Sequence, residues 1–156
     1  MSKSVDIEDT VTLRTYCHGC KQDLNVMVSR AIIDDAKSYP ISHAHLHGNP
    51  AHILILYVDS QYHIRGTELS ETVTVERSRK VTPLNAMVLL RIPPRYKRTA
   101  MAMLKLHQAN AREVATITGK KPKVESYYLG SIFRLGYLER TRIKNFYQYS
   151  LPGLVG

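Results

Sequence analysis

The stretch that decides the fold is ITGKKPKVESYYLGSIFRLGYLERTRIKNFYQYSL, residues 117–151. Apolar residues recur at helical spacing over 123–135, and the stretch ends at Gly136, which predicts a helix. Its expected core face carries Val124, Tyr128, Leu129, Ile132 and Phe133. Two β-like runs follow at 137–142 and 146–151 and predict a hairpin. Lysines and arginines outnumber the two glutamates of this stretch, so we expect a basic helix followed by a basic hairpin.

Further helices are expected before this stretch. A short helix is predicted over 83–91 and a longer one over 95–107, with Pro93-Pro94 between them. Asn110 and Glu113 have the spacing of a capping box, and Gly119 is placed to end the helix that they begin. The resulting order is helix, helix, turn, helix, hairpin. This is the order of a winged helix-turn-helix, whose third helix enters the DNA major groove.

The charge of the chain is divided unevenly between its halves. Residues 1–80 carry nine Lys and Arg against ten Asp and Glu, whereas residues 81–156 carry thirteen against three, which together give the net charge of +9. A positive field confined to one half attracts a polyanion to that half. Two modules with different roles are the simplest interpretation.

The first half predicts a small α+β domain. Residues 11–16 alternate like a half-buried strand, and a helix is expected from the spacing of Leu24, Val28, Ala31 and Ile32. Strands are also predicted at 41–47, at the apolar run 53–58, at 62–65 and at 71–76. The fold class is therefore α+β, with an N-terminal domain at 1–80 and a C-terminal winged-helix domain at 81–156.

The first half also contains a cysteine and histidine set, in TYCHGC and SHAHLHGNPAH. Cys17 and Cys20 form half of a tetrahedral metal site. His43, His45 and His47 lie on one face of the predicted strand, and His52 follows. The sequence predicts zinc held by Cys17, Cys20, His45 and His47, with His43/His47 and His47/His52 as the pairs that match the usual histidine spacing.

Two other interpretations of the cysteines stay open. A strand, then Cys-x-x-Cys, then a helix is the thioredoxin-like arrangement, although residues 20–50 are short for that fold. The alternative is two ordinary thiols beside surface histidines.

Three segments of the second half resemble a known family: AREVATITG at 111–119, ESYYLGSIFRLGYLER at 125–140 and YQYSL at 147–151. Over about residues 95–151 the chain resembles the winged helix-turn-helix domains of archaeal transcription regulators of the ArsR/MarR-like type. The first 80 residues resemble no family that we recognise.

The resemblance implies a set of DNA-binding residues. The recognition helix would present Lys120, Lys121, Lys123, Ser126, Tyr127 and Arg134, and the wing would present Arg140, Arg142 and Lys144. Lysines and arginines would contact phosphates, while Ser126 and Tyr127 would reach base edges. Glu125 departs from this basic pattern; it would pair with Lys121, cap the helix, or accept a hydrogen bond from a cytosine amine. Tyr127 is expected to be exposed, and Tyr128, Tyr137 and Tyr149 to serve packing.

These features predict a DNA-binding transcription regulator with a sensing or dimerisation domain at its N-terminus. An RNA- or ribosome-associated factor and a protein-interaction adaptor are the alternatives. Phosphate-binding loops, dinucleotide fingerprints and nucleophile elbows are absent from the sequence, so we expect no enzymatic activity. We expect a cytoplasmic homodimer that is not membrane-bound, with the helix at 83–91 as the dimer contact through Leu84, Met87, Val88 and Leu90.

Overall fold

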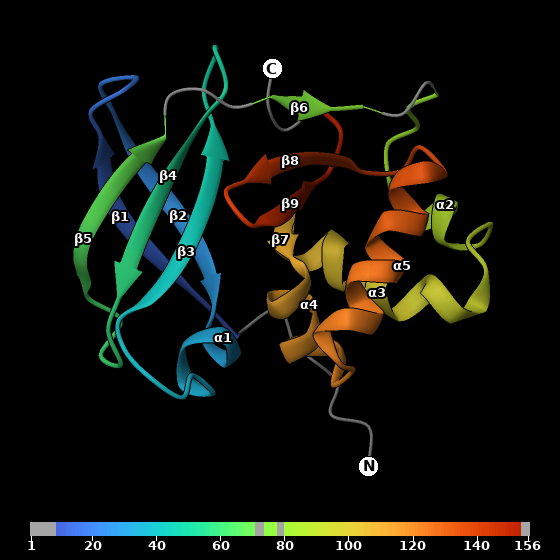
Figure 1. The fold of residues 1–156 in the computed structure, drawn as a ribbon, viewed down its shortest axis with the longest axis horizontal. Coiled ribbons are helices and arrows are strands. Elements are labelled where there is room, and N and C mark those ends of the chain that lie inside the picture. The colour runs from blue at the N-terminus through green and yellow to red at the C-terminus, as the bar shows by residue number, and fades with distance from the viewer. Residues whose placement is uncertain (1–8, 71–73, 78–79, 154–156) are drawn as a thin grey trace.

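The computed structural model describes residues 9–70, 74–77 and 80–153, and its fold is of the α+β class. Figure 1 shows the strands of the first part on one side and the helices of the second part on the other. Among the described residues, no helix has both the length and the apolar character needed to cross a membrane.

The first part consists of two antiparallel sheets and one short helix. Strands β1 (Thr10–Cys17) and β2 (Gln22–Ser29) form a hairpin, and α1 (Arg30–Asp34) follows directly. Strands β3 (Ile41–His47), β4 (His52–Val58) and β5 (Ile64–Ser70) form a sheet with β4 in the centre. The near-continuous apolar run of β4 suits a strand that is covered on both faces, because most of its side chains are buried.

The helix expected after the cysteines is wrong for residues 22–29, which form β2. Val26 and Val28 alternate into the core and are 0% and 1% exposed, which is the period of a strand. The apolar residues from Leu24 to Ile32 fit a helical spacing only by chance, because they belong to two elements. Residues 24–29 lie in β2, and only the last part of the run belongs to α1. The strands predicted at 11–16, 41–47 and 53–58 are confirmed.

The second part contains helices α2 (Ala86–Leu89), α3 (Pro94–Leu106), α4 (Ala111–Thr118) and α5 (Pro122–Arg134). The helices expected from residue 95 onward are confirmed to within a residue or two. Asn110 and Glu113 make the predicted capping box, and Gly119 has the left-handed conformation at the end of α4. The helix predicted over 83–91 is shorter than expected, because Asn85, and not Thr82, caps it.

Four strands complete this part. They are β6 (Val75–Glu76), β7 (Gln108–Asn110), β8 (Glu139–Ile143) and β9 (Phe146–Ser150), in the sheet order β6-β8-β9-β7. The predicted hairpin is thus confirmed, whereas β7 was not expected. Of the strand expected at 71–76, residues 71–73 lie outside the described residues. Strand β6 comes from the first 80 residues but pairs with β8 in the second part.

The core of the second part includes Leu129, Ile132 and Tyr149, with Tyr128, Phe133 and Tyr137 packed at its edge. These residues take the packing positions predicted for them. Val124 does not, since it is 37% exposed. In the first turn of α5 the buried position belongs to Glu125, which lies between α3 and α4.

A separate apolar cluster joins the two parts. Ile143, at the end of β8, is buried with Ala44 and Leu46 of β3 and with Ile53 and Ile55 of β4. The β8–β9 hairpin therefore packs on the β3-β4-β5 sheet instead of projecting into solvent.

Candidate functional site

Two β-turns bring four possible metal ligands together. Cys17 ends β1 and Cys20 lies in the turn before β2, while His47 ends β3 and His52 begins β4. The ligand atoms of these four residues all lie within 4.8 Å of one another. The cluster could therefore hold a metal ion between the β1–β2 hairpin and the β3-β4-β5 sheet.

Backbone carbonyls orient both histidine rings of the cluster. His47 Nδ1 lies 3.3 Å from the His45 carbonyl oxygen, and His52 Nδ1 lies 3.0 Å from that of Pro50. A carbonyl only accepts hydrogen bonds, so each Nδ1 carries the proton and each neutral ring keeps its lone pair on Nε2. His52 Nε2 is 3.3 Å from Cys17 Sγ. His47 Nε2 is buried and has no hydrogen-bond partner among the described residues. This is the arrangement of metal-binding imidazoles, whose second nitrogen is usually hydrogen-bonded.

The two thiols are in different environments. Burial raises the pKa of Cys17, but hydrogen bonds with the backbone of Cys20 and Gly19 outweigh burial, so the pKa is lowered. Burial and the neighbouring Cys17 raise the pKa of Cys20. Burial also lowers the pKa of His47, with a further contribution from His52. Thiolate sulfur and neutral imidazole are the forms that bind a metal.

A glycine makes room for the fourth ligand. Gly48 has φ of +83°, and a Cβ there would lie 2.4 Å from His52 Cε1. The turn can therefore place His52 beside Cys17 only because residue 48 lacks a side chain.

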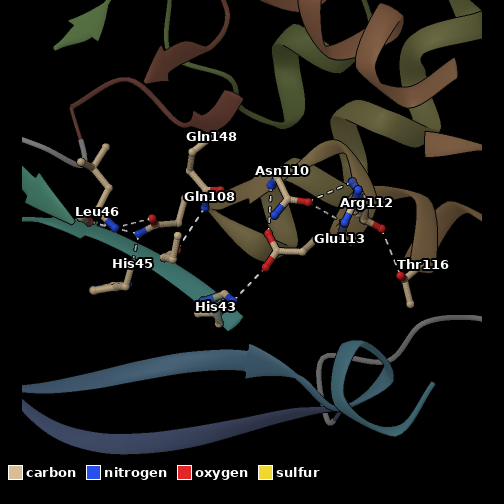
Figure 2. A network of polar contacts seen from close by, with 10 residues as sticks. His43, His45, Leu46, Gln108, Asn110, Arg112, Glu113, Thr116 and Gln148 are labelled. Atoms are coloured by element: carbon tan, nitrogen blue, oxygen red, sulfur yellow. Dashed lines mark hydrogen bonds and ion pairs between the residues drawn. The ribbon is translucent and has the colours of Figure 1, made fainter. Parts of the chain in front are cut away.

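The group of converging ligand atoms does not include His45, which the sequence predicted as a ligand, and contains His52 instead. His45 Nδ1 lies 3.1 Å from Gln108 Nε2 in β7. Burial, together with His43 and His47, lowers the pKa of His45 to about 4. His43 is engaged as well, with Nδ1 2.9 Å from Glu113 Oε1 in α4. Both rings contact the second part of the molecule instead of the cysteines (Figure 2).

The thioredoxin-like arrangement is also not the one observed. That arrangement requires a helix directly after the second cysteine, and Cys20 is followed by β2. Both cysteines are free thiols, Cys17 at the end of β1 and Cys20 in the turn that follows.

Helix α5 exposes most of the residues predicted to bind DNA. Lys121, Lys123, Ser126, Tyr127 and Arg134 are all exposed, Tyr127 with 59% of its surface. Lys120 is half-buried; its Nζ lies 4.7 Å from the centroid of the Tyr128 ring and 4.0 Å from Glu125 Oε1. Lys120 thus contacts Tyr128 and Glu125 of α5 and adds little to the exposed basic surface of that helix.

Glu125 has none of the roles considered for it from the sequence. It is fully buried, and its two carboxyl oxygens accept hydrogen bonds from the hydroxyls of Thr99 in α3 and Thr118 in α4, each at 2.6 Å. It neither pairs with Lys121 nor faces outward, so it holds three helices together.

Two of the three basic residues predicted for the wing are paired with acids from the first 80 residues. Arg140 Nε lies 2.6 Å from Glu76 Oε2, and its guanidinium lies 4.3 Å from the Phe133 ring centroid. Lys144 Nζ lies 3.4 Å from Glu68 Oε1. Arg142 is exposed on β8. The hairpin therefore uses much of its positive charge within the molecule.

None of the acidic side chains of residues 81–153 is exposed. Glu113, Glu125 and Glu139 are 6%, 0% and 2% exposed. Glu113 contacts His43, Glu125 accepts from the two threonines, and Glu139 pairs with Arg77. Most of the basic side chains of the same segment lie on the surface. The segment therefore contributes a cationic surface with no exposed carboxylate of its own; the acids that pair with Arg140 and Lys144 come from the first part.

One known protein is similar to part of the chain. It is an uncharacterized protein of Archaeoglobus fulgidus, 35% identical over 57 residues, which are 36% of this chain and 77% of that protein. The chain belongs to the family of this archaeal protein. No family model and no solved structure matches.

The sequence predicted three members of this group, Cys17, Cys20 and His47, and named His52 only as a spacing partner of His47. It did not single out Gln108. The interval from His47 to His52 was one of the two that fitted the usual histidine spacing, and the Gly48–Pro50 segment between them signals a turn. Together these features could have identified His52. No local signal distinguishes Gln108, because its contacts with β3 are made by residues about sixty positions apart.

Proposed function

We propose that residues 94–150 form a winged-helix domain and that the chain is a DNA-binding transcription regulator that contacts the duplex through α5. The order α3, β7, α4, α5, β8, β9 supports this domain, as does the antiparallel order β8-β9-β7. The turn between α4 and α5 is short, with Gly119 in the left-handed conformation, as helix-turn-helix units require.

The observation that carries the proposal is that the exposed charged side chains of the second half are basic. All three of its glutamates are buried, while Lys123 and Arg134 of α5 and Lys121 at its N-cap are exposed. Exposed basic side chains on a helix that carries no exposed carboxylate attract phosphates and give salt-dependent affinity. Ser126 and Tyr127, exposed on the same helix, are available for base edges.

We favour duplex DNA over RNA because the exposed basic element is an α-helix, α5. The major groove of B-form DNA admits an α-helix, whereas that of an A-form RNA helix is too deep and narrow for side chains to read. The hairpin is held by Ile143, Glu68 and Glu76, so α5 and Arg142 are expected to make most of the contacts.

Salt-dependent binding of a labelled DNA duplex tests the proposal. The affinity should fall steeply with salt, and Lys121→Ala and Lys123→Ala should each reduce the slope of log K against log salt by about one. Lys37→Ala, an exposed lysine of the first part, is the matched control and should leave the slope unchanged. Equal slopes for all four proteins would contradict binding through α5.

Competition separates the two alternative functions. Structured RNA that displaces the duplex at fixed salt would favour the RNA-associated factor. An adaptor role predicts that Lys123→Glu/Arg142→Glu leaves recruitment of a protein partner intact.

For the metal cluster we propose zinc. Two thiolates and two neutral imidazoles carry a charge of −2, which balances a divalent ion, and this is the ligand set of structural zinc sites. The partnerless Nε2 of His47 supports an ion in the same place. The purified full-length protein should contain one equivalent of zinc. His52→Ala should lose it and His45→Gln should keep it, and the reverse result would make His45 the ligand.

We also propose that the chain acts as a homodimer. Met87 in α2 and Leu90 at its C-cap are each 73% exposed, while Leu84 and Val88 are buried and face the core. A Met87→Ser/Leu90→Ser variant should sediment as a monomer if these two residues form the contact. A wild-type protein that sediments as a monomer at all concentrations would contradict the proposal.

A further inference from the structure

Strand β3 connects the metal cluster to the second part of the molecule. His43, His45 and His47 are alternate residues of β3, so their side chains leave the same face. His47 belongs to the cluster, and its ring stacks on that of His45 with centroids 5.3 Å apart. His45 faces Gln108, and His43 faces Glu113. Figure 2 shows these contacts reaching from β3 to the start of α4.

The Gln108 side chain makes two hydrogen bonds with the backbone of β3 next to the metal cluster. Its side-chain oxygen accepts from the Leu46 N–H at 2.6 Å, and its Nε2 donates to the Leu46 carbonyl at 3.1 Å. β3 is an edge strand of its sheet, so the glutamine amide takes the place of a neighbouring strand. The position of β7, which carries Gln108, therefore depends on the position of β3 one residue before His47.

Glu113 makes the same connection at the other end of β3. Its Oε1 faces His43 Nδ1, and its Oε2 accepts from the Asn110 N–H at 2.9 Å to close the first turn of α4. Both His43 and Glu113 are buried. One carboxylate thus holds β3 and the helix that precedes α5.

We propose that a metal ion in the Cys17, Cys20, His47 and His52 cluster regulates nucleic-acid binding by fixing β3 and, through Gln108 and Glu113, the start of α4. The inference rests on the proposed function of α5. The ion binds only the arrangement in which both turns converge, so it shifts the population toward that arrangement. The metal-loaded protein should bind a duplex more tightly than the metal-free protein, by a factor on the order of ten.

The test uses the full-length protein with and without one equivalent of zinc. Two quantities are measured in parallel: the Kd for a labelled duplex, and the rate of amide hydrogen exchange in α4. Zinc should tighten duplex binding about tenfold and slow exchange in α4. A His43→Ala/Gln108→Ala variant keeps all four metal ligands and α5, and it should bind zinc as the wild type does but lose both responses.

A matched variant controls for the loss of one histidine and one glutamine. Gln61→Ala/His63→Ala changes two exposed residues of the β4–β5 turn and should keep both responses. Equal exchange in α4 with and without zinc, in wild-type protein that has bound the metal, would overturn the inference. If zinc slows exchange but neither form binds a duplex, the coupling stands and the proposed function of α5 fails.

Discussion

At the scale of single residues, Gly48 decides whether the metal cluster can form. Its φ of +83° is matched by Gly153 at +84°, but an added Cβ would meet His52 at residue 48 and nothing within 4 Å at residue 153. An alanine in the left-handed region costs roughly 1–2 kcal/mol by itself. The difference between the two sites therefore isolates the contact with His52.

We expect Gly48→Ala to lose zinc and to be less stable than Gly153→Ala. The alanine methyl would push the His52 ring away from Cys17, so the cluster would lack its fourth ligand. Metal content and chemical denaturation of the two variants check this. Equal metal content in both would mean that His52 is not held by the turn.

The residues of the cluster also mark the limit of what a sequence predicts at this scale. The Cys-x-x-Cys spacing identifies two ligands because both lie in one turn. His45 shares a face of β3 with His47, so whether His45 or His52 joins them depends on which of the two lies next to the cysteines, and this is decided by packing. The buried position of Glu125 is likewise determined by Thr99 and Thr118, which come from two other helices.

At the scale of elements, α5 was predictable and β2 was not. The amphipathic pattern of α5 extends over a whole helix, and a proline and a glycine mark its limits. The segment 22–34 contains a strand and a short helix in direct succession. The spacing of its apolar residues therefore combines the period of a strand with that of a helix. A single period fitted to that segment gives the wrong element.

The packing of α3, α4 and α5 depends on Glu125. We expect Glu125→Ala to cost about 2–4 kcal/mol in the free energy of unfolding, because two buried threonine hydroxyls would lose their partner at about 1–3 kcal/mol each. Chemical denaturation measures this loss. Thr116→Val is a suitable control, since the Thr116 hydroxyl lies on the exposed side of α4 and bonds only within that helix.

The cause can be separated from the loss of side-chain volume. Replacing all three polar partners with apolar residues, as Thr99→Val/Thr118→Val/Glu125→Leu, should recover much of the stability, because no buried polar group is then left unpaired. A triple variant as unstable as Glu125→Ala would refute the hydrogen-bond explanation.

At the scale of the whole molecule, the two parts are joined by buried contacts. His43 meets Glu113, Gln148 Nε2 donates to the Ala44 carbonyl at 3.1 Å, and Ile143 is buried among residues of β3 and β4. The sequence predicted the two parts from charge and composition. It could not predict the joint, because each of these contacts connects residues that are far apart along the chain.

We therefore expect the chain to unfold in a single transition. Ile143→Ala should cost about 2–4 kcal/mol and should lower the protection of β4 and α3 amides together, because it opens the joint and not one part alone. Hydrogen exchange as a function of denaturant provides the measurement. Loss of protection confined to the helices would indicate two parts that unfold independently.

Gln108 on β7 and Gln148 on β9 also affect whether copies of the chain associate through their strands at high concentration. β3 is an edge strand whose free N–H and C=O groups would be a template for a strand of another copy. Gln108 occupies these groups at Leu46, and Gln148 occupies the carbonyl of Ala44. The second half thereby shields the first from intermolecular strand pairing, and this protection against aggregation would be lost wherever the joint opened.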